Sequence, residues 1–388
     1  MTLDSLLDRV RLLHEDLELS SVRDWKEAEP GRKAIGHMPI YVPRELIHAA
    51  GMLPVGVLGG GDRLEIIRGD AFFQSYICRI PRSTIELGLS GRLDVLDGML
   101  FPSICDVIRN LSGMWQILFQ DRYVRYIDVP QNFDPKVGGL FWRRELEHLR
   151  DDLSKLSGRP ITDEGLRASI AVYNENRKAI RALYLERSRR PWVYPLSEVY
   201  LVLRAGNVLP PEEHTSLIRA YLEHAALDLS RREQDQSRVI LVGMFCEQPP
   251  HGLLVTLERA GCSVVDDDLL LGLRWLTGEV PVDGDPLENL VMAYLTMSAS
   301  TASRYSPEGN RGRWLIDSCR ANLAEGVIFC APSFCDPALL EQPMLVSALE
   351  REGIPHTEFK YSEDTGQFAV IREQAGTFSD SIRLWSEA

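Results

Sequence analysis

The sequence predicts an α/β protein that contains two parallel-sheet domains with a helical segment between them. Short apolar runs alternate with amphipathic segments across residues 34–140, and the same alternation resumes across residues 237–388. Residues 141–236 instead carry long amphipathic segments with dense charge pairing four residues apart. Strands that alternate with helices imply a parallel sheet covered on both faces, whereas sustained helical periodicity implies a helical segment.

The chain has 388 residues, which is more than a single hydrophobic core usually supports. We therefore expect several folded units. The expected units are an N-terminal helical segment (1–33), a first α/β domain (34–140), a helical segment (141–236) and a second α/β domain (237–388).

Strands and helices are expected in the order in which the apolar runs occur. In the first domain, the expected strands are AIGHMPIYV (34–42), LPVGVLGGG (53–61), GMLFPSI (98–104) and YVRYIDV (123–129). The helices between them are expected at PRELIHAAG (43–51), 71–90 and 105–118. In the second domain, the expected strands are VILVGMF (239–245), CSVVD (262–266), GVIFCAP (326–332) and HTEFKY (356–361). Helices are expected there from about residue 250, twice across 285–323, from residue 337, and through residue 372.

A cysteine-containing pentapeptide occurs once in each α/β domain, as PSICD and PSFCD. Each copy follows an apolar strand and precedes a helix, for which Asp106 and Asp336 are plausible N-caps. Cys105 and Cys335 would then emerge at the carboxyl ends of parallel strands, where open α/β sheets bind their ligands. The helix N-terminus should favour the thiolate form of each cysteine.

A third cysteine, Cys78 in FFQSYICRIPRS, belongs with this pair because we place it on the helix after the second strand, near the same sheet edge. Three roles remain open for the set: ligands of a cluster assembled across both domains, a nucleophile, or buried packing residues. Structural zinc is disfavoured because no CxxC occurs. Spacing alone does not decide among these roles.

The other four cysteines are treated separately. Seven cysteines form an odd set, and in a reducing compartment they do not indicate a disulfide framework. Cys262, Cys319 and Cys330 are expected to pack in the interior. Cys246, in FCEQPP, lies at the end of the first strand of the second domain and is a weaker candidate for the edge of a cluster or substrate site.

Charge and missing motifs exclude several classes of function. The net charge is −13, with 56 acidic and 43 basic residues, which argues against a nucleic-acid partner. The longest uncharged runs are shorter than a membrane span, and the N-terminal stretch lacks the apolar core of a secretion signal, so we expect a cytoplasmic protein with no membrane partner. The motifs GxxxxGK[ST], GxSxG and HExxH are absent.

Several longer runs carry a family resemblance. They are YVPRELIHAAGMLPVGVLGGGD, GDAFFQSYICRIPRSTIELGLSGR, DGMLFPSICDVIRNLSGMW, FCEQPP, AEGVIFCAPSFCDPALLE and REQAGTFSDSIRLW. Over nearly the whole chain, the sequence resembles the smaller non-ATPase (gamma) subunit of ATP-dependent benzoyl-CoA reductases, which belong to the 2-hydroxyacyl-CoA dehydratase superfamily. The cysteine contexts are specific to the superfamily, and PSICDVIRNLSGMW and FCEQPP point to the benzoyl-CoA branch.

The resemblance implies a 4Fe-4S cluster held at Cys78, Cys105 and Cys335, on paired Rossmann-like or flavodoxin-like domains. It implies a hetero-oligomer with a larger homologous subunit and two ATP-binding subunits that pass on electrons from reduced ferredoxin. The implied activity is reductive dearomatisation of benzoyl-CoA or a substituted analogue to a cyclohexadiene-carbonyl-CoA. The alternatives are a 2-hydroxyacyl-CoA dehydratase subunit, or an electron-transfer and assembly subunit that does not bind substrate.

Charged residues near these motifs each have a structural and a functional interpretation. Arg79, Arg82 and Arg109 follow the candidate ligands and would pair with carboxylates, or would compensate cluster charge and contact CoA phosphates. Glu45 and His48 lie one helical turn apart and would be held in local pairs, or would act as a catalytic proton relay.

Two further predictions concern the second domain. Asp266 to Asp268 are expected to cap a solvated loop. Arg372 and Gln374, in REQAGTF, are weaker candidates for a helix face against the cluster crevice.

Overall fold

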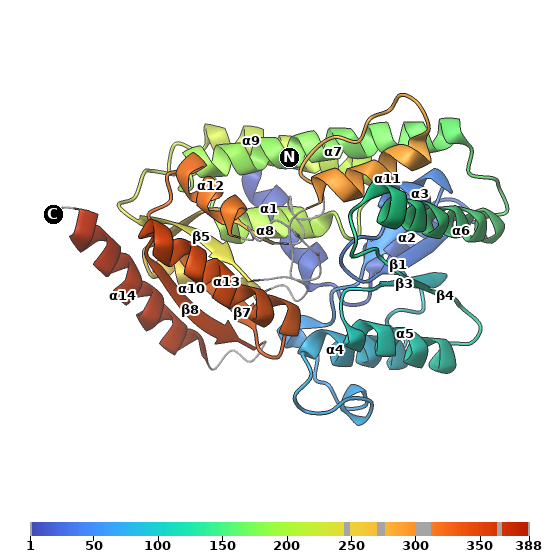
Figure 1. Cartoon of the computed structure of the whole chain (residues 1–388), viewed down its shortest axis with the longest axis horizontal. Helices are drawn as coiled ribbons and strands as arrows, with labels where there is room; N and C mark the ends of the chain where they lie inside the picture. Colours follow the sequence, from blue (N-terminus) through green and yellow to red (C-terminus); the bar gives the residue numbers. More distant parts are fainter. Residues whose placement is uncertain (1, 244–248, 270–275, 299–311, 363–366, 387–388) are drawn as a thin grey trace.

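Two four-stranded parallel sheets form the framework of the protein (Figure 1). The computed structural model describes the chain except for residues 1, 244–248, 270–275, 299–311, 363–366 and 387–388. The first sheet contains β1 (Ala34–His37), β2 (Leu53–Gly56), β3 (Gly98–Pro102) and β4 (Tyr123–Ile127). The second contains β5 (Ser237–Val242), β6 (Cys262–Asp267), β7 (Gly326–Pro332) and β8 (His356–Tyr361).

The two sheets have the same topology. Their strand orders are β2-β1-β3-β4 and β6-β5-β7-β8, and every pairing is parallel. β3 and β7 are buried along their whole length, as expected for strands covered on both faces. The predicted α/β class with two parallel sheets is therefore confirmed, and the equal orders are consistent with two Rossmann-like or flavodoxin-like units.

Helices cover both faces of each sheet. Those of the first half are α3 (Arg44–Ala49), α4 (Arg79–Leu89) and α5 (Asp106–Leu118). Those of the second half are α10 (His251–Arg259), α12 (Arg313–Ala321), α13 (Asp336–Glu352) and α14 (Phe368–Ser386). α11 (Pro286–Met297) lies between β6 and β7 in the sequence but packs on the helical layer that joins the two sheets. α5 packs on β3 and β4, α13 packs on β7, and α14 packs on β5, β6 and β8. Among the described residues, no helix is both long enough and apolar enough to cross a bilayer.

A helical layer joins the two sheets. It contains α6 (Leu140–Ser157), α7 (Asp163–Arg189), α8 (Leu196–Ala205) and α9 (Pro211–Leu227), and the N-terminal helices α1 (Leu3–Glu15) and α2 (Ser20–Glu27) precede the first sheet. α1 packs on α8 and α9, and α11 packs on α6 and α7. Figure 1 shows α7 and α9 running side by side along one edge of the molecule, past both sheets. Helices from outside residues 141–236 thus contribute to this layer.

α7 is the longest helix, with 27 residues, which corresponds to about 40 Å at the α-helical rise. The Thr162 side chain caps its first turn by accepting the Gly165 N–H at 3.1 Å, and acidic residues in its first turn complement the helix dipole. α7 contacts α3 in the first half and β6 in the second. The helix is therefore long enough and rigid enough to fix the positions of the two halves relative to each other.

One buried ion pair links α7 to each half. Arg177 pairs with Glu45 on α3, and both side chains are buried. Arg187 meets Asp267 at the end of β6, with 2.6 Å between Nη1 and Oδ2 and no solvent exposure of either side chain. None of the three guanidinium nitrogens of Arg187 makes a hydrogen bond to the described residues, so its contact with Asp267 is an ion pair. Asp267 Oδ1 instead accepts the Tyr184 hydroxyl at 2.7 Å.

The prediction that Asp266 to Asp268 cap a solvated loop is wrong. β6 extends through Asp267, so the carboxylates lie within the sheet and its covering helices. Asp266 accepts from the Asn322 side chain at 3.2 Å, and Asp268 accepts the Gly243 N–H at 2.9 Å. Burial raises the pKa of Asp266. A run of three acidic residues looked like a surface loop because its buried partners are distant in the sequence.

The predicted helix at 71–90 is shorter than expected. α4 begins at Arg79, and the preceding loop contains the short 3₁₀ turns η1 (Gly61–Arg63) and η2 (Gly69–Ala71). Glu86 holds this loop, because its Oε2 accepts the backbone N–H groups of residues 67, 68 and 69 at 2.6–2.9 Å. A Cβ at Gly69 would lie 2.2 Å from the Arg82 carbonyl oxygen, so only glycine fits this approach.

Candidate functional site

The three candidate ligand cysteines occupy the same local position in three different helices. Cys78, Cys105 and Cys335 are the N-cap residues of α4, α5 and α13. The predictions of Asp106 and Asp336 as N-caps are therefore wrong by one residue. Both aspartates occupy the first helical turn instead, where a carboxylate still complements the helix dipole.

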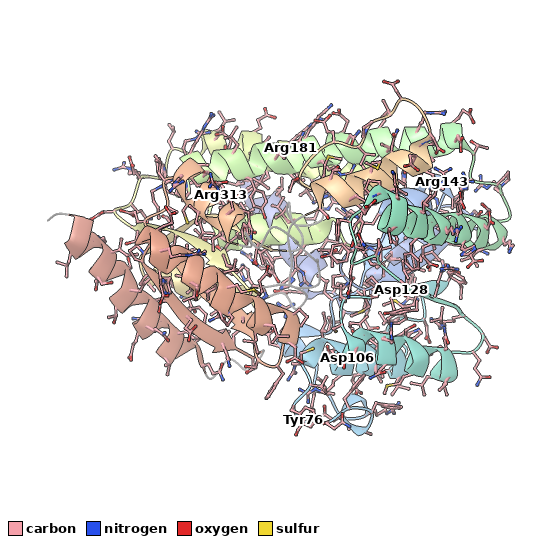
Figure 2. All side chains as sticks on the ribbon, in the orientation of Figure 1. Tyr76, Asp106, Asp128, Arg143, Arg181 and Arg313 are labelled. Carbon is pink, nitrogen blue, oxygen red and sulfur yellow. The ribbon has the colours of Figure 1, made fainter. Side chains whose placement is uncertain are left out.

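The topology brings these helix N-termini to the carboxyl ends of the strands in both sheets. α5 follows β3, and α13 follows the equivalent strand β7. Figure 1 shows the beginnings of α4, α5 and α13 around the region between the sheets, and Figure 2 places Asp106 at the end of α5 that faces the second half. Cys105 and Cys335 lie within electrostatic range of each other. The repeated pentapeptides therefore face each other across the two halves.

The two pentapeptides differ in local conformation. Phe334 has φ 66°, a left-handed conformation that is unusual for a bulky residue, and its side chain is 52% exposed. The matching Ile104 is buried. Non-glycine residues in this conformation cluster at functional sites because the surrounding structure must hold them there. This feature was not visible in the sequence, since PSFCD and PSICD look equivalent.

Burial, rather than the helix dipole, dominates the ionisation of Cys105. The pKa of Cys105 is raised to about 11, chiefly by desolvation; charge on Cys335 and Asp106 adds to the increase, and backbone N–H groups of α5 oppose it. The helix N-terminus does favour the thiolate of this cysteine, as expected, but burial outweighs that effect and the net pKa is raised. A metal centre would deprotonate such thiols directly, because a coordinated thiol loses its proton.

The chemistry of the three thiols is compatible with an iron–sulfur cluster, because such clusters are held by cysteine thiolates. Within the described ranges, no three His, Cys, Asp or Glu side chains are grouped closely enough to hold one metal ion. A cubane cluster binds each cysteine through a different iron, so its ligands lie farther apart than those of one ion. Cys78, Cys105 and Cys335 stand on three separate helix N-termini, as separate ligands of one cluster would. Cluster ligation by Cys78, Cys105 and Cys335 stays a prediction.

The remaining cysteines divide as follows. Cys262, Cys319 and Cys330 are buried in the hydrophobic interior, and burial raises the pKa of each thiol. The packing role predicted for them is thus consistent with their positions. Cys246 lies outside the described residues.

The arginines after the candidate ligands have different partners. Arg82 pairs with Asp70 at 2.9 Å, as the structural interpretation predicted. Arg79 donates to the Leu64 carbonyl at 2.8 Å. Arg109 lies over the Tyr126 ring, with its Cζ 5.4 Å from the ring centroid. Arg79 and Arg82 therefore also brace the loop that leads to α4.

Glu45 and His48 do not act as a pair. The Glu45 carboxylate is committed to Arg177. His48 Nδ1 lies 2.9 Å from Ser169 Oγ, and its Nε2 lies 3.2 Å from Glu212. Each residue thus connects α3 to the helical layer through its own partners, and their catalytic role stays a prediction.

Arg372 and Gln374 lie at the start of α14. Gln374 donates to the Glu358 carbonyl on β8 at 2.7 Å, and Arg372 is exposed. This part of α14 therefore packs along the edge strand of the second sheet.

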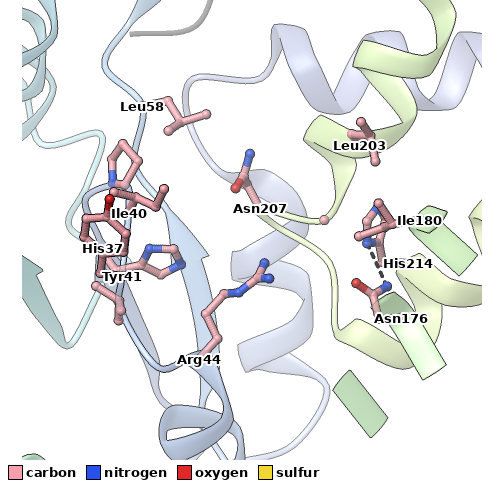
Figure 3. A pocket seen from close by; sticks show the side chains of 13 residues that line it. His37, Ile40, Tyr41, Arg44, Leu58, Asn176, Ile180, Leu203, Asn207 and His214 are labelled. Carbon is pink, nitrogen blue, oxygen red and sulfur yellow. Dashed lines mark hydrogen bonds between the residues drawn. The ribbon is translucent and has the colours of Figure 1, made fainter. Parts of the chain in front are cut away.

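A cavity lies at the carboxyl ends of β1 and β2, where the first half meets α7, α8 and α9 (Figure 3). The sequence did not indicate it, because its lining comes from four separate segments. Two buried histidines line it. Burial and the charge of Arg44 lower the pKa of His37 to about 3, and burial lowers that of His214 to about 4.

The low pKa values of these two histidines predict that the folded protein loses stability in acid. The unfolded chain takes up a proton on each below pH 6.5, whereas the native state stays neutral down to about pH 4. The free energy of unfolding should therefore fall as pH decreases from 6.5 to 4, by up to about 3 kcal/mol per pH unit for the pair. Urea unfolding at pH 7, 6 and 5 measures this slope. His214→Gln should reduce the slope by up to about 1.4 kcal/mol per pH unit, while the same change at His148, which is 65% exposed, should leave it unchanged; equal slopes in both variants would contradict the assignment.

Comparison with known proteins connects this architecture to a family. The family model for 2-hydroxyglutaryl-CoA dehydratase, D-component, matches residues 39–382. The chain is 57% identical over 387 residues to one of the subunits of benzoyl-CoA reductase from Thauera aromatica, with 100% of both chains covered. It is 28% identical over 354 residues to the (R)-phenyllactyl-CoA dehydratase beta subunit of Clostridium sporogenes, with 91% of this chain and 93% of that one covered. The match to the beta subunit of (R)-2-hydroxyglutaryl-CoA dehydratase from Acidaminococcus fermentans is also 28% identical, over 356 residues, with the same shares covered. The resemblance seen in the sequence motifs is confirmed, and the chain belongs to the 2-hydroxyglutaryl-CoA dehydratase D-component family.

Proposed function

We propose that this chain is the 4Fe-4S-bearing smaller subunit of an ATP-dependent benzoyl-CoA reductase. The complex would reduce benzoyl-CoA, or a substituted analogue, to a cyclohexadiene-carbonyl-CoA. The full-length similarity to a benzoyl-CoA reductase subunit supports this choice within the family. The observation that carries the metal assignment is the placement of Cys78, Cys105 and Cys335 at three helix N-termini on both halves.

The protein's own residues have defined tasks in this proposal. The three cysteines would hold the cluster as thiolates, and the backbone N–H groups at the three helix N-termini would stabilise its negative charge. Glu86 would fix the loop before Cys78 through its three backbone contacts. When bound, the cluster would supply single electrons of low potential, with a potential tuned by such hydrogen bonds and by burial.

The proposed assembly is a hetero-oligomer. Relatives named as a subunit of a reductase and as beta subunits of dehydratases support a role within a multi-subunit enzyme. We propose a larger homologous subunit as the direct partner, with two ATP-binding subunits that deliver electrons from reduced ferredoxin. A cytoplasmic location is part of the same proposal.

A dehydratase subunit is the second candidate. It is favoured by the matches to two dehydratase beta subunits, which cover 91% of this chain. The two activities differ in electron balance, because reduction of the ring consumes reductant whereas loss of water from a 2-hydroxyacyl-CoA is redox-neutral.

Turnover by the assembled complex distinguishes the candidates. The complex is supplied anaerobically with ATP, a limiting amount of reduced ferredoxin, and either benzoyl-CoA or 2-hydroxyglutaryl-CoA. We expect benzoyl-CoA to be consumed in proportion to the electrons supplied, with two electrons per diene formed. Many turnovers of the hydroxyacyl thioester per electron would overturn the reductase assignment and support the dehydratase.

The location of substrate tests a third candidate, an electron-transfer and assembly subunit. A structure of the complex with benzoyl-CoA shows which chain contacts the thioester. We expect residues of this chain to line the acyl site. If the partner subunit supplies every contact, this chain only carries electrons and supports assembly.

A further inference from the structure

The cavity in Figure 3 combines apolar walls with one cationic group. The cavity volume that the centres of water-sized molecules can occupy is about 60 Å³. Figure 3 shows the side chains that line it. Its lining comes from the segment after β1, the start of α3, the segment after β2, and α7 to α9. The side chains used below are His37, Ile40, Arg44, Leu58, Leu203 and Asn207.

Arg44 has no carboxylate partner in the part of the chain that the structure describes. Its guanidinium lies over the Tyr173 ring, with 5.2 Å from Cζ to the ring centroid, and Figure 3 shows it projecting into the cavity. The nearest acidic residue in sequence, Glu45, is neutralised by Arg177, and Glu212 contacts His48. Arg44 is half-buried and has no counter-ion among the described residues, so the cavity presents a positive charge that favours an anion.

Asn207 supplies a second unsatisfied donor. Its amide nitrogen Nδ2 is buried and has no hydrogen-bond acceptor, and Figure 3 shows this side chain beside the same space. Buried amide donors are almost always satisfied by protein or by a bound molecule. An acceptor for the Asn207 amide is therefore expected to come from a bound molecule.

The other polar groups of the cavity differ in their availability. His214 is fully engaged, because its Nδ1 lies 3.0 Å from Asn176 Nδ2 and its Nε2 lies 3.0 Å from the Val202 carbonyl. His37 makes one hydrogen bond among the described residues, 3.4 Å from Nδ1 to the Met38 carbonyl, so its Nε2 is not committed to a protein partner. The hydrogen-bonded side chains of His214 and Asn176 therefore form part of the cavity wall and are not assigned a bond to the ligand.

We propose that this cavity binds a small monocarboxylate with an apolar body. Arg44 would donate charge-assisted hydrogen bonds to one carboxylate oxygen, and Asn207 would donate to the other. Ile40, Leu58 and Leu203, each less than 8% exposed, would enclose the apolar part. A dianion is disfavoured because the described lining carries one permanent positive charge. The site goes beyond the proposed function, because none of its lining residues is a candidate cluster ligand and its binding needs no cluster.

Calorimetric titration of the full chain tests the site, with benzoate and butyrate as probes. Benzoate should bind saturably with one site per chain. Arg44→Gln should weaken it at least tenfold, and Arg44→Lys should retain part of the affinity because the charge is preserved. Asn207→Leu should weaken binding without lowering the melting temperature, since it removes a donor that is unsatisfied in the free protein.

Arg219→Gln is the matched control, because Arg219 is a surface residue paired with Glu175 and carries the same charge change. The proposal is overturned if benzoate binds Arg44→Gln and Arg219→Gln equally, or if neither carboxylate binds the wild-type chain saturably. Two ligand controls refine this test. If benzamide binds as tightly as benzoate, the charge of the ligand does not contribute to binding. If inorganic phosphate binds more tightly than benzoate, the apolar walls do not select the ligand. Iron content should be equal in all variants, which separates failure of this site from failure of the proposed function.

Discussion

Replacing Cys335 by Ser is expected to abolish the iron and acid-labile sulfide of the anaerobically purified protein. Cys335 caps α13 after the buried strand β7, and it is the only one of the three candidate ligands in the second half. Its loss would leave two cysteines, both on the first half, and a cluster of this type is held by cysteine thiolates. Serine has nearly the same size, but its hydroxyl is a much weaker iron ligand than a thiolate.

Cys319→Ser is the control for this result. Cys319 is also buried in the second half, at 3% exposure, but it packs in a separate core beneath α12 and α13. Its substitution should cost some stability and leave iron content unchanged. Circular dichroism of both variants checks that each is folded. Equal iron content in the two variants would refute the cluster assignment.

Replacing Arg187, the buried partner of Asp267, is expected to destabilise the protein by about 3 to 5 kcal/mol, because the charge of Asp267 would remain unpaired in the interior. The test variant is Arg187→Met, which keeps much of the side-chain volume. Both members of the pair are inaccessible to solvent, so water cannot replace the lost guanidinium. Chemical denaturation measured at neutral pH gives the difference in unfolding free energy.

Arg181→Met provides a matched change on the same helix. Arg181 pairs with Glu279 at the surface, where the side chains are 33% and 40% exposed, and Figure 2 shows it on the outer side of α7. Its loss should cost less than about 1 kcal/mol. A double variant, Arg187→Met with Asp267→Leu, should recover much of the lost stability, since it leaves no charge unpaired. If Arg187→Met costs no more than Arg181→Met, the pair does not anchor the second half to α7.

This ion pair also has a consequence for the cysteines. α7 is attached to α3 through Arg177 and Glu45 and to β6 through Arg187 and Asp267. It therefore helps to set how the N-termini of α5 and α13 face each other. The helical segment, for which the sequence indicated only a position between the two domains, acts as a brace between the two halves that carry the candidate ligands.

Local sequence patterns predicted the fold class and most elements. The strands appear as short apolar runs because both faces of a parallel sheet are buried, and this signal needs no long-range information. The limits of α4 were wrong because Glu86 binds backbone groups 17 to 19 residues earlier. Helical periodicity cannot reveal such a contact.

For the candidate site, too, some features follow from the sequence and others only from the tertiary structure. The sequence by itself determined that one cysteine follows an equivalent strand in each half and placed Cys78 near the same sheet edge, and the family resemblance implied that the three are cluster ligands. Only the tertiary structure decided that all three are N-caps, that burial keeps the pKa of Cys105 high, and that Asp267 is an interior anchor rather than a solvated loop residue. It also brought together Arg44 and Asn207, which are far apart in the sequence, in one cavity. Motifs record neighbours along the chain, whereas burial and charge pairing depend on neighbours in space, which only the packed fold provides.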